Sequence, residues 1–380
     1  MHALDLRAPA EVFVPRRAHS DLTEQRLRDY RPEVLGPVKA LARRHTRLAD
    51  LASSFPALLF ALAHPREGTD PEPAIRAVIA GETLGQAARL AGVPLWLRRA
   101  GPKLFTAPLP ALPDTTFLRR TIVNHLPRHA QQSASWFEII SAAAREGTDE
   151  FAVWCARHLA RSRQKKLVHR LRLLSLWAWY SAQPDARGHA LIERPFESNL
   201  TVASAIMSAE KWQIEVMLHL DLGGATIDDN WVAPAIVDGY EFKPLRNERA
   251  IRKEAREMQN CLRTYGYAVV MGRVRLWSVR KDGARVATLS LGRSSSLPLV
   301  SITEMKGVRN KAVPHEMLRA AQRWLFTHML PEAEPQNAQF PAVELSRDSW
   351  TALWKPYWLA KQRVPDWLPL TPSRGAFGRL

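Results

Sequence analysis

Cysteine is nearly absent from this chain of 380 residues. Only Cys155 and Cys261 occur, and they lie far apart in the sequence. Two cysteines cannot build a disulfide framework or a four-cysteine zinc site. Because chains without disulfides are typical of reducing compartments, we expect a cytoplasmic protein.

Long hydrophobic runs are also missing. The best candidate, 55–63, has about half of the ~20 residues that a membrane-spanning helix needs. Residues 1–20 mix charged and apolar side chains and contain no apolar core of the length found in signal peptides. The sequence therefore predicts a soluble protein with no membrane partner.

Recognisable catalytic and cofactor motifs are absent as well. The sequence has no Walker loop, dinucleotide fingerprint, His-Glu-x-x-His motif or serine-nucleophile elbow. The spacing of Cys261, Glu257 and His315 matches no recognisable zinc ligand set. We therefore expect no cofactor and no bound metal ion.

Acidic residues are few compared with basic ones. The chain has 54 Lys and Arg against 37 Asp and Glu, a formal net charge of +17 and a pI near 10.4. Such an excess attracts polyanions, so nucleic acid is the expected partner. The alternative is a merely basic surface, because arginine greatly outnumbers lysine, as in proteins from GC-rich genomes.

Patterning predicts a helical first part and a smaller mixed part, with the main boundary between about 185 and 235. The expected divisions are an arm (1–20), a helical region (21–230, with a break near 103–113), an α+β domain (235–330), a Trp/Pro-rich segment (331–370) and a flexible tail (371–380).

Prolines are expected to start helices in the first part. Pro37 and Pro56 each precede an apolar stretch, and proline suits the first helical turn. Residues 83–99 superficially match a helix-turn-helix with Gly92 at the turn. Because Gly101 and Pro102 stop the second helix after barely two turns, an ordinary packed helical hairpin is the alternative.

The most basic segment extends from Arg161 to Arg172. Its cations surround leucines that form one apolar side of an expected helix. This segment either lies along a phosphate backbone or is a solvated helix face. The candidate nucleic-acid-binding residues here are Arg161, Arg163, Lys165, Lys166, Arg170 and Arg172.

Residues from about 237 to 330 predict a compact α+β unit. Strands are expected over 237–245, 273–280, 284–291 and 299–305, with helices over 248–262 and 314–328. Lys281-Asp282-Gly283 is a hairpin signal. The predicted fold class is α+β: a mostly α-helical N-terminal region, a small β-α-β-β-β-α unit with an antiparallel sheet, and a Trp-rich helical C-terminus.

Several short motifs follow one another in this unit: Glu254-Ala-Arg-Glu-Met258-Gln-Asn-Cys261-Leu-Arg-Thr-Tyr265, Gly272, Leu276-Trp-Ser-Val-Arg280, Val286-Ala-Thr288-Leu-Ser-Leu, Ile302-Thr-Glu304-Met-Lys306-Gly307 and Asn310. In order and spacing this set resembles the PcfJ-like domain, which is named after a conjugative-plasmid protein and also occurs in bacterial chromosomes and mobile elements. The helical half, with Pro94-Leu-Trp-Leu-Arg98, resembles the N-terminal region of proteobacterial members more weakly.

The resemblance covers about residues 235–330 and implies the α+β fold and an association with mobile elements. It implies no particular activity. Glu304 stands where members often have glutamine, and Asn260 stands where some have histidine.

Polar residues around the last strand are the strongest candidates for chemistry. If Ile302 faces the helix, Glu304 and Lys306 share its sheet face by alternation. Near Tyr265 they could bind a phosphate or a base, or act as acid and base. The alternative is a strand-end salt bridge beside a turn. Candidate nucleic-acid-binding residues here are Lys306, Arg309 and Asn310.

Cys261 completes the candidate catalytic set of Glu304, Lys306, Tyr265 and Cys261. A nucleophilic cysteine must be a thiolate, which nearby cations or a helix N-terminus favour. Cys261 is expected near a helix C-terminus with Glu257 one turn back, and both features disfavour the thiolate. A cysteine packed under the sheet is therefore the alternative.

Trp350, Trp354 and Trp358 recur every four residues and form one aromatic stripe on a helix. The stripe either packs back onto the helical region, or forms a docking surface for a protein partner or a stacking surface for single-stranded nucleic acid.

Together these patterns predict a non-enzymatic nucleic-acid-associated protein of a mobile-element or accessory system. An enzyme that acts on nucleic acid or nucleotide through the polar site is one alternative, and a protein–protein scaffold is another. The choice between DNA and RNA stays open.

Overall fold

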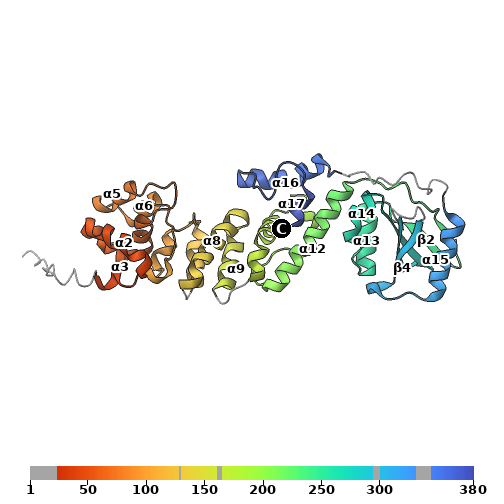
Figure 1. Ribbon diagram of the computed structural model, residues 1–380, viewed down its shortest axis with the longest axis horizontal. Coiled ribbons are helices and arrows are strands. Elements are labelled where there is room, and N and C mark those ends of the chain that lie inside the picture. Colours follow the sequence, from red (N-terminus) through yellow and green to blue (C-terminus); the bar gives the residue numbers. More distant parts are fainter. Residues whose placement is uncertain (1–23, 128–129, 161–164, 294–299, 331–343) are drawn as a thin grey trace, which may run out of the picture. The chain divides into compact units, whose positions relative to one another are not determined.

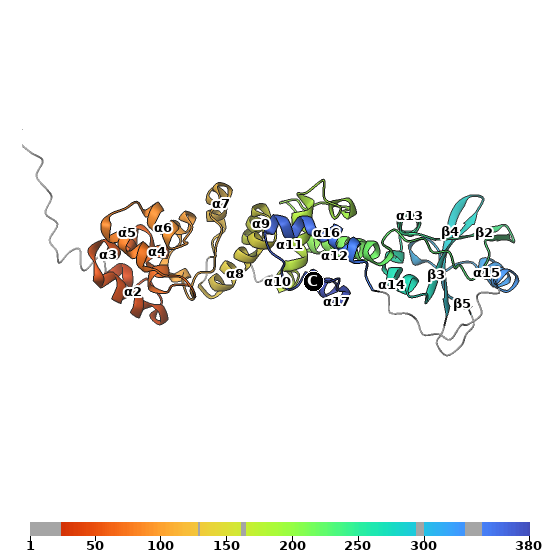
Figure 2. The ribbon, with the colours of Figure 1, turned by 90° about the horizontal axis from the view of Figure 1, so that it is seen from above.

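The computed structural model describes residues 24–127, 130–160, 165–293, 300–330 and 344–380. The chain divides into two compact units (Figures 1 and 2). The first takes in the chain up to Trp179 together with Glu197–Val202, and the second takes in Tyr180–Phe196 and Ala203–Leu380. The second unit therefore begins at Tyr180, slightly before the boundary expected between about 185 and 235, and the chain returns to the first unit for Glu197–Val202.

The first unit is helical throughout its described residues. Its elements are α2 (Pro32–Arg44), α3 (Thr46–Ser54), α4 (Pro56–Ala63), α5 (Glu72–Ala80), α6 (Leu84–Leu90), η1 (Leu95–Arg99), η2 (Pro102–Leu104), α7 (Thr116–Thr121), η3 (Ile122–His125), α8 (Ala130–Glu146), α9 (Asp149–Leu159), α10 (Lys165–His169) and α11 (Leu171–Ser181). Stacked rings of Phe60, Phe105 and Phe137 run through its core.

Proline position agrees with the sequence prediction at one helix start and differs at another. Pro56 begins α4 as predicted. Pro37, however, lies inside α2, which begins at Pro32. Pro32 takes the first-turn position in which a proline costs no hydrogen bond.

The helix-turn-helix interpretation of residues 83–99 is wrong. After α6, the second element is η1, a five-residue 3-10 helix, and its Trp96 and Leu97 are buried. Trp96 Nε1 donates to the carbonyl oxygen of Pro113 at 2.9 Å. A single turn held in the core is too short to lie in a major groove, so this segment is the packed hairpin.

The second unit combines helices with one sheet. Its elements are η4 (His189–Leu191), α12 (Val202–Leu222), β1 (Ala235–Val237), β2 (Tyr240–Pro244), α13 (Glu248–Met258), η5 (Leu262–Tyr265), α14 (Gly266–Val270), β3 (Val274–Lys281), β4 (Ala284–Arg293), β5 (Val300–Lys306), η6 (Val308–Asn310), α15 (His315–His328), α16 (Arg347–Lys361) and α17 (Arg374–Gly378). This is the predicted α+β class with an antiparallel sheet.

The sheet is a meander in which the strands lie in chain order, β1 to β5, and every neighbouring pair is antiparallel. Asp282 and Gly283 have positive φ and form the predicted hairpin turn between β3 and β4. Asp238 and Gly239 make a matching turn between β1 and β2. Residues 235–245 therefore form a hairpin, where the sequence analysis predicted one strand.

Helices cover the two faces of the sheet, with α15 on one side and α13 and α14 on the other (Figures 1 and 2). On the α15 side, Trp324 stacks on Phe242 with ring centroids 4.5 Å apart and meets Trp277 edge-on at 4.6 Å. On the α13 side, Ile251 and Ala255 pack with Leu276 of β3. The sheet thus has two separate cores.

The C-terminal segment packs onto α12 and the end of α11 within the second unit. Trp354 contacts Trp212 and Tyr180 with ring centroids 6.4 and 5.8 Å apart. Phe377 of α17 is also fully buried, 5.0 Å from Trp354. The prediction of a flexible tail over 371–380 is therefore wrong.

None of the helices in the described ranges combines the length and the apolar character needed to cross a bilayer.

Candidate nucleic-acid interface

Helix α13 carries a row of cations on its solvent side. Arg249, Arg252, Lys253 and Arg256 recur at intervals of three and four residues, so they fall within an arc of roughly 100°. We call these four residues the α13 stripe. The opposite side of the helix carries the buried apolar residues that pack on the sheet.

The α13 stripe borders an open cleft of about 650 Å³. Arg187, in the segment before η4, adds a fifth cation to the lining. Two carboxylates oppose these five cations, so the cleft attracts anions. Its remaining lining residues are Ala190, Leu191, His219, Glu248 and Glu257.

The members of this lining differ in whether a carboxylate already neutralises them. Arg252 forms ion pairs with two carboxylates: its Nε lies 2.8 Å from Glu215 and an Nη lies 2.5 Å from Glu248. In the described parts of the chain, by contrast, Arg187, Arg249 and Arg256 have no ion-pair partner, and all three are exposed. These three guanidinium groups are therefore available to a bound anion.

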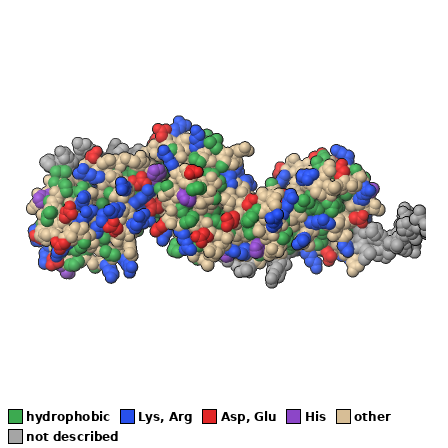
Figure 3. Space-filling view, turned by 180° about the vertical axis from the view of Figure 1, so that it is seen from behind, with side chains coloured by type: hydrophobic (Ala, Val, Ile, Leu, Met, Phe, Trp, Pro, Cys, Tyr) green, Lys and Arg blue, Asp and Glu red, His purple; other side chains and the backbone are tan. Residues whose placement is uncertain are grey.

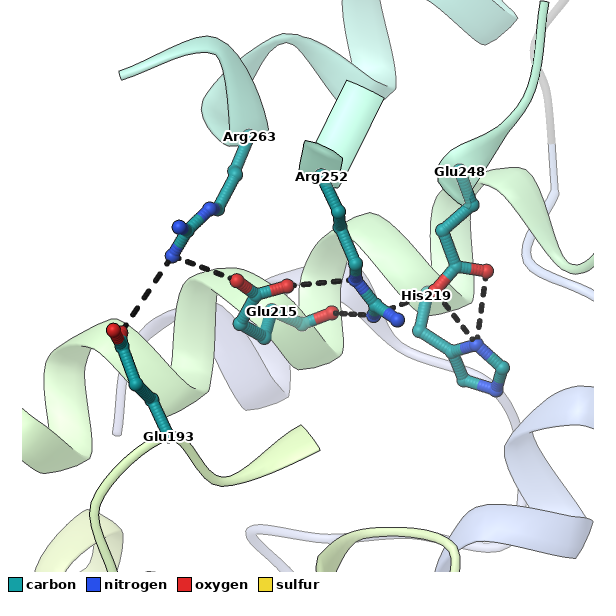
Figure 4. Close-up of polar contacts among 6 residues, drawn as sticks. All are labelled: Glu193, Glu215, His219, Glu248, Arg252 and Arg263. Carbon is teal, nitrogen blue, oxygen red and sulfur yellow. Dashed lines mark hydrogen bonds and ion pairs between the residues drawn. The ribbon is translucent and has the colours of Figure 1, made fainter. Parts of the chain in front are cut away.

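A ladder of alternating charges lies where α12 meets α13 and η5, and three of its members, His219, Glu248 and Arg252, form one wall of the cleft (Figure 4). Glu215 lies between Arg252 and Arg263, with an Nη of Arg263 at 2.8 Å. Arg263 also lies 3.9 Å from Glu193, and His219 Nδ1 lies 3.2 Å from both oxygens of Glu248. These charge-assisted contacts join α12 to α13 and η5, and they hold Arg252 of the stripe in place.

Glu248 is the anion that anchors this wall. Burial raises its pKa, but the hydrogen bond with His219 and the charge of Arg252 outweigh burial, so the pKa of Glu248 is lowered overall. The carboxylate therefore stays ionised near neutral pH and holds Arg252 in place.

The sequence analysis missed this cleft. The four cations of the stripe were not among the predicted binding residues. Their spacing of three and four residues was the available signal. The contribution of Arg187, which is distant in sequence, carried no such signal.

The sheet face under α13 holds a second polar group, centred on Glu254. This carboxylate is fully buried; it accepts from Arg285 Nε at 2.7 Å and from Thr288 Oγ1 at 3.3 Å. Asn260 Nδ2 in turn donates to Thr288 Oγ1 at 3.1 Å, and Arg285 also pairs with Glu257. Every member has a partner, so this group stabilises the packing of α13 on β4.

Tyr265 and Glu304 meet as the sequence analysis proposed, with the phenol donating to the Glu304 carboxylate at 2.9 Å. Burial, together with the hydrogen bond to Glu304, raises the pKa of Tyr265 to about 12. The alternative of a salt bridge between Glu304 and Lys306 is not seen in the described residues. The half-buried Lys306 has no side-chain partner among the described residues.

A β-bulge changes which side of the sheet Ile302 occupies. Glu304 pairs with Ser290 and Lys306 pairs with Thr288, so both lie on the α13 face. The register shifts between Ser290 and Leu291, and Ile302 packs in the core under α15. The predicted common face of Glu304 and Lys306 is confirmed, but Ile302 does not share it.

The predicted helix 248–262 contains Cys261, but in the structure Cys261 lies beyond the end of the helix and outside the core. Helix α13 ends at Met258 because Gln259 adopts a left-handed conformation, with φ 50° and ψ 50°. Cys261 follows in the next turn and is exposed. It immediately precedes η5, the short helix that ends at Tyr265. The alternative of a cysteine packed under the sheet is wrong.

The turn after β5 comes close to the end of α13. Arg309 Nε donates to Gln259 Oε1 at 2.7 Å, and both side chains are exposed. Arg309 and Asn310 both have positive φ, at 57° and 59°. Two of the predicted nucleic-acid-binding residues therefore lie one helical turn beyond Arg256, the last cation of the stripe.

In the first unit, the basic segment is only partly described. Arg161 and Arg163 lie outside the described residues. Lys165 and Lys166 on α10 and Arg172 on α11 are exposed, and Arg170 is half-buried. Figure 3 shows Lys and Arg side chains spread over both units, with acidic side chains among them, so the positive charge on this face is not confined to one patch.

The aromatic stripe is not a docking surface. Trp350 and Trp354 are fully buried and Trp358 is 7% exposed. Trp350 Nε1 donates to the carbonyl oxygen of Pro369 at 2.9 Å. The predicted protein partner through these three residues is therefore wrong, and packing onto helices is confirmed.

In the described ranges, no three His, Cys, Asp or Glu side chains are grouped so as to hold a metal ion. Comparison of the chain with protein-family models, with curated proteins and with solved structures finds no match. The resemblance to the PcfJ-like domain stays a prediction.

Proposed function

We propose that this protein binds nucleic acid without catalysis, by holding the phosphate backbone along the α13 stripe. The observation that carries the proposal is the set of three exposed guanidinium groups without a carboxylate partner, Arg187, Arg249 and Arg256, around one cleft. Exposed surface cations with nothing to neutralise them are the groups that release counterions when phosphates bind.

The length of the stripe supports this proposal. Arg249 and Arg256 are separated by two helical turns, or about 10 Å. One strand of B-DNA carries a charge every ~3.4 Å along its axis, so the stripe is long enough for about three phosphates. As the PcfJ-like resemblance implies, this activity would serve a mobile-element or accessory system.

The test is the salt dependence of binding to fluorescent oligonucleotides, with single-stranded and duplex forms of DNA and RNA. We expect the double variant Arg249→Gln, Arg256→Gln to bind more weakly and to lower the slope of log K against log salt by about 1.4 on single strands. The matched control is Arg76→Gln, Arg319→Gln, which removes the same charge from exposed positions on α5 and α15. Equal slopes for the two double variants, or no binding even at low salt, would refute the proposal.

The basic segment of the first unit gives a separate test of the predicted contacts there. Lys165→Gln, Lys166→Gln removes two exposed cations of α10. If this segment also binds the backbone, the slope falls by about 1.4 again. An unchanged slope would make this segment a solvated face.

A second candidate function is catalysis at Tyr265 and Glu304, with Cys261 just before η5, because Tyr265 donates to Glu304 at 2.9 Å. It predicts cleavage or modification of the bound oligonucleotide that Glu304→Gln abolishes. Recovery of intact oligonucleotide after prolonged incubation with the wild-type protein would exclude cleavage.

A further inference from the structure

The turn Val308–Asn310 holds two consecutive non-glycine residues in the left-handed region. Arg309 has φ 57° and ψ 35°, and Asn310 has φ 59°. Asparagine adopts this conformation readily, but arginine does so at a cost that surrounding contacts must offset. Left-handed residues of this kind cluster at binding sites, which directs attention to what Arg309 contacts.

One atom of the Arg309 guanidinium, Nε, is hydrogen-bonded, and the two Nη groups have no partner in the described residues. Its Nε donates to Gln259 Oε1 at 2.7 Å, and Gln259 is itself held in a left-handed conformation at the end of α13. No other partner of the Arg309 guanidinium, of the Gln259 amide nitrogen or of the Asn310 side chain occurs in the described residues. All three side chains are exposed. The turn thus presents an oriented guanidinium flanked by two amides.

This group of donors suits the edge of a nucleobase. The two Nη groups of arginine donate in parallel to O6 and N7 of guanine, which is the commonest specific contact between a side chain and a base. The Gln259 amide nitrogen and the Asn310 amide add further donors beside the guanidinium.

The position of the turn links it to the α13 stripe. Gln259 follows Arg256 by three residues, so the turn lies one helical turn beyond the last cation of the stripe. A strand whose phosphates follow the stripe would pass this turn. In a duplex, base edges are accessible only within a groove, whereas an unpaired base can turn out toward a flat surface.

We propose that Arg309, with Gln259 and Asn310, contacts the edge of an unpaired guanine in a single strand whose phosphates lie on the α13 stripe. This inference rests on the function proposed above. It adds a base preference to a contact that would otherwise be independent of sequence.

The test compares two single strands of equal length, one of thymine alone and one with isolated guanines in thymine, as deoxy and ribo forms. We expect the wild-type protein to bind the guanine-containing strand roughly tenfold more tightly at the same salt concentration. Arg309→Lys keeps the charge but loses the bidentate donor pair, so it should abolish the preference and leave the salt slope unchanged. Arg309→Gly, whose backbone accepts φ 57° without strain, should also abolish it.

The stripe variant Arg249→Gln, Arg256→Gln is the complementary control, because it should lower the salt slope and retain the guanine preference. Equal wild-type affinity for the two strands would overturn the inference and leave the backbone contact standing. A preference that survives in both Arg309 variants would overturn it too. No salt-dependent binding of either strand would refute the proposed function and, with it, this inference.

Discussion

The two faces of the five-stranded sheet are built on different physical principles. The face under α15 is filled by aromatic and aliphatic side chains, including Phe242, Trp277 and Trp324. The face under α13 has an apolar cluster too, but it also buries Ser278, Thr288 and Ser290, with Glu254 above them. Apolar burial is tolerant of exact geometry, whereas a buried polar group needs each of its partners. All candidate functional residues of the sheet belong to the polar face.

The largest expected effect concerns the apolar face. Trp324→Ala removes a fully buried indole that stacks on Phe242 and donates to the carbonyl oxygen of Ala233. We expect a loss of about 3–5 kcal/mol in the free energy of unfolding, measured by urea denaturation. The control on the same helix is Phe326→Ala, because Phe326 is 79% exposed. Equal losses in the two variants would show that the α15 face is not the core described here.

The next effect concerns the polar face. Arg285→Met leaves the buried Glu254 carboxylate without its cation and should cost about 3 kcal/mol in the same measurement. The double variant Glu254→Met, Arg285→Met removes both charges and should recover much of that loss. A double variant that is less stable than Arg285→Met would contradict the account of this face as a paired network.

A smaller effect is expected from pH. Because the pKa of Tyr265 is about 12 in the folded protein and ordinarily 10, the folded state favours the neutral phenol. Its stabilising contribution is complete below the ordinary pKa and is lost as the pH rises through about 12. The phenolate absorbance of wild type minus that of Tyr265→Phe reports the titration, and Glu304→Gln should shift it to lower pH. An unshifted titration in Glu304→Gln would argue against the Tyr265–Glu304 hydrogen bond.

The smallest effect on stability concerns the two cysteines. Cys261 is exposed beside the polar face, whereas Cys155 is fully buried and burial raises the pKa of its thiol. A thiol reagent should therefore label one cysteine in the folded protein and both after unfolding. Cys261→Ser should remove the fast label and change stability by less than about 0.5 kcal/mol. Fast labelling that persists in Cys261→Ser would place Cys155 at the surface instead.

Local signals predicted the strands well, because alternation and the Asp282-Gly283 turn act over a few residues. The same kind of signal at Asp238-Gly239 was available, but the short strands around it resembled one longer strand. The bulge in β5 could not be predicted from alternation, since alternation assumes an unbroken register. It reversed the predicted side of Ile302 while leaving Glu304 and Lys306 together.

The candidate site was predicted in part for a similar reason. Tyr265 and Glu304 were correctly expected to be near one another, because the α+β pattern folds their segments together. The pairing of Glu254 with Arg285 depends on how α13 lies across β4, which helix periodicity does not specify. The cleft needs Arg187 from a segment distant in sequence, so only tertiary structure could reveal it.

The meander order of the sheet has a consequence for how the second unit folds. Because every hydrogen-bonded pair of strands is also consecutive in the chain, the two Asp-Gly hairpins can form from local contacts alone. The long connection in the sheet is the one from β2 to β3, which contains α13 and α14. Joining the β1–β2 hairpin to β3 requires that connection to close, which costs more entropy than closing either two-residue turn. This connection includes α13, so the helix that carries the stripe is part of the segment that joins the first hairpin to the rest of the sheet.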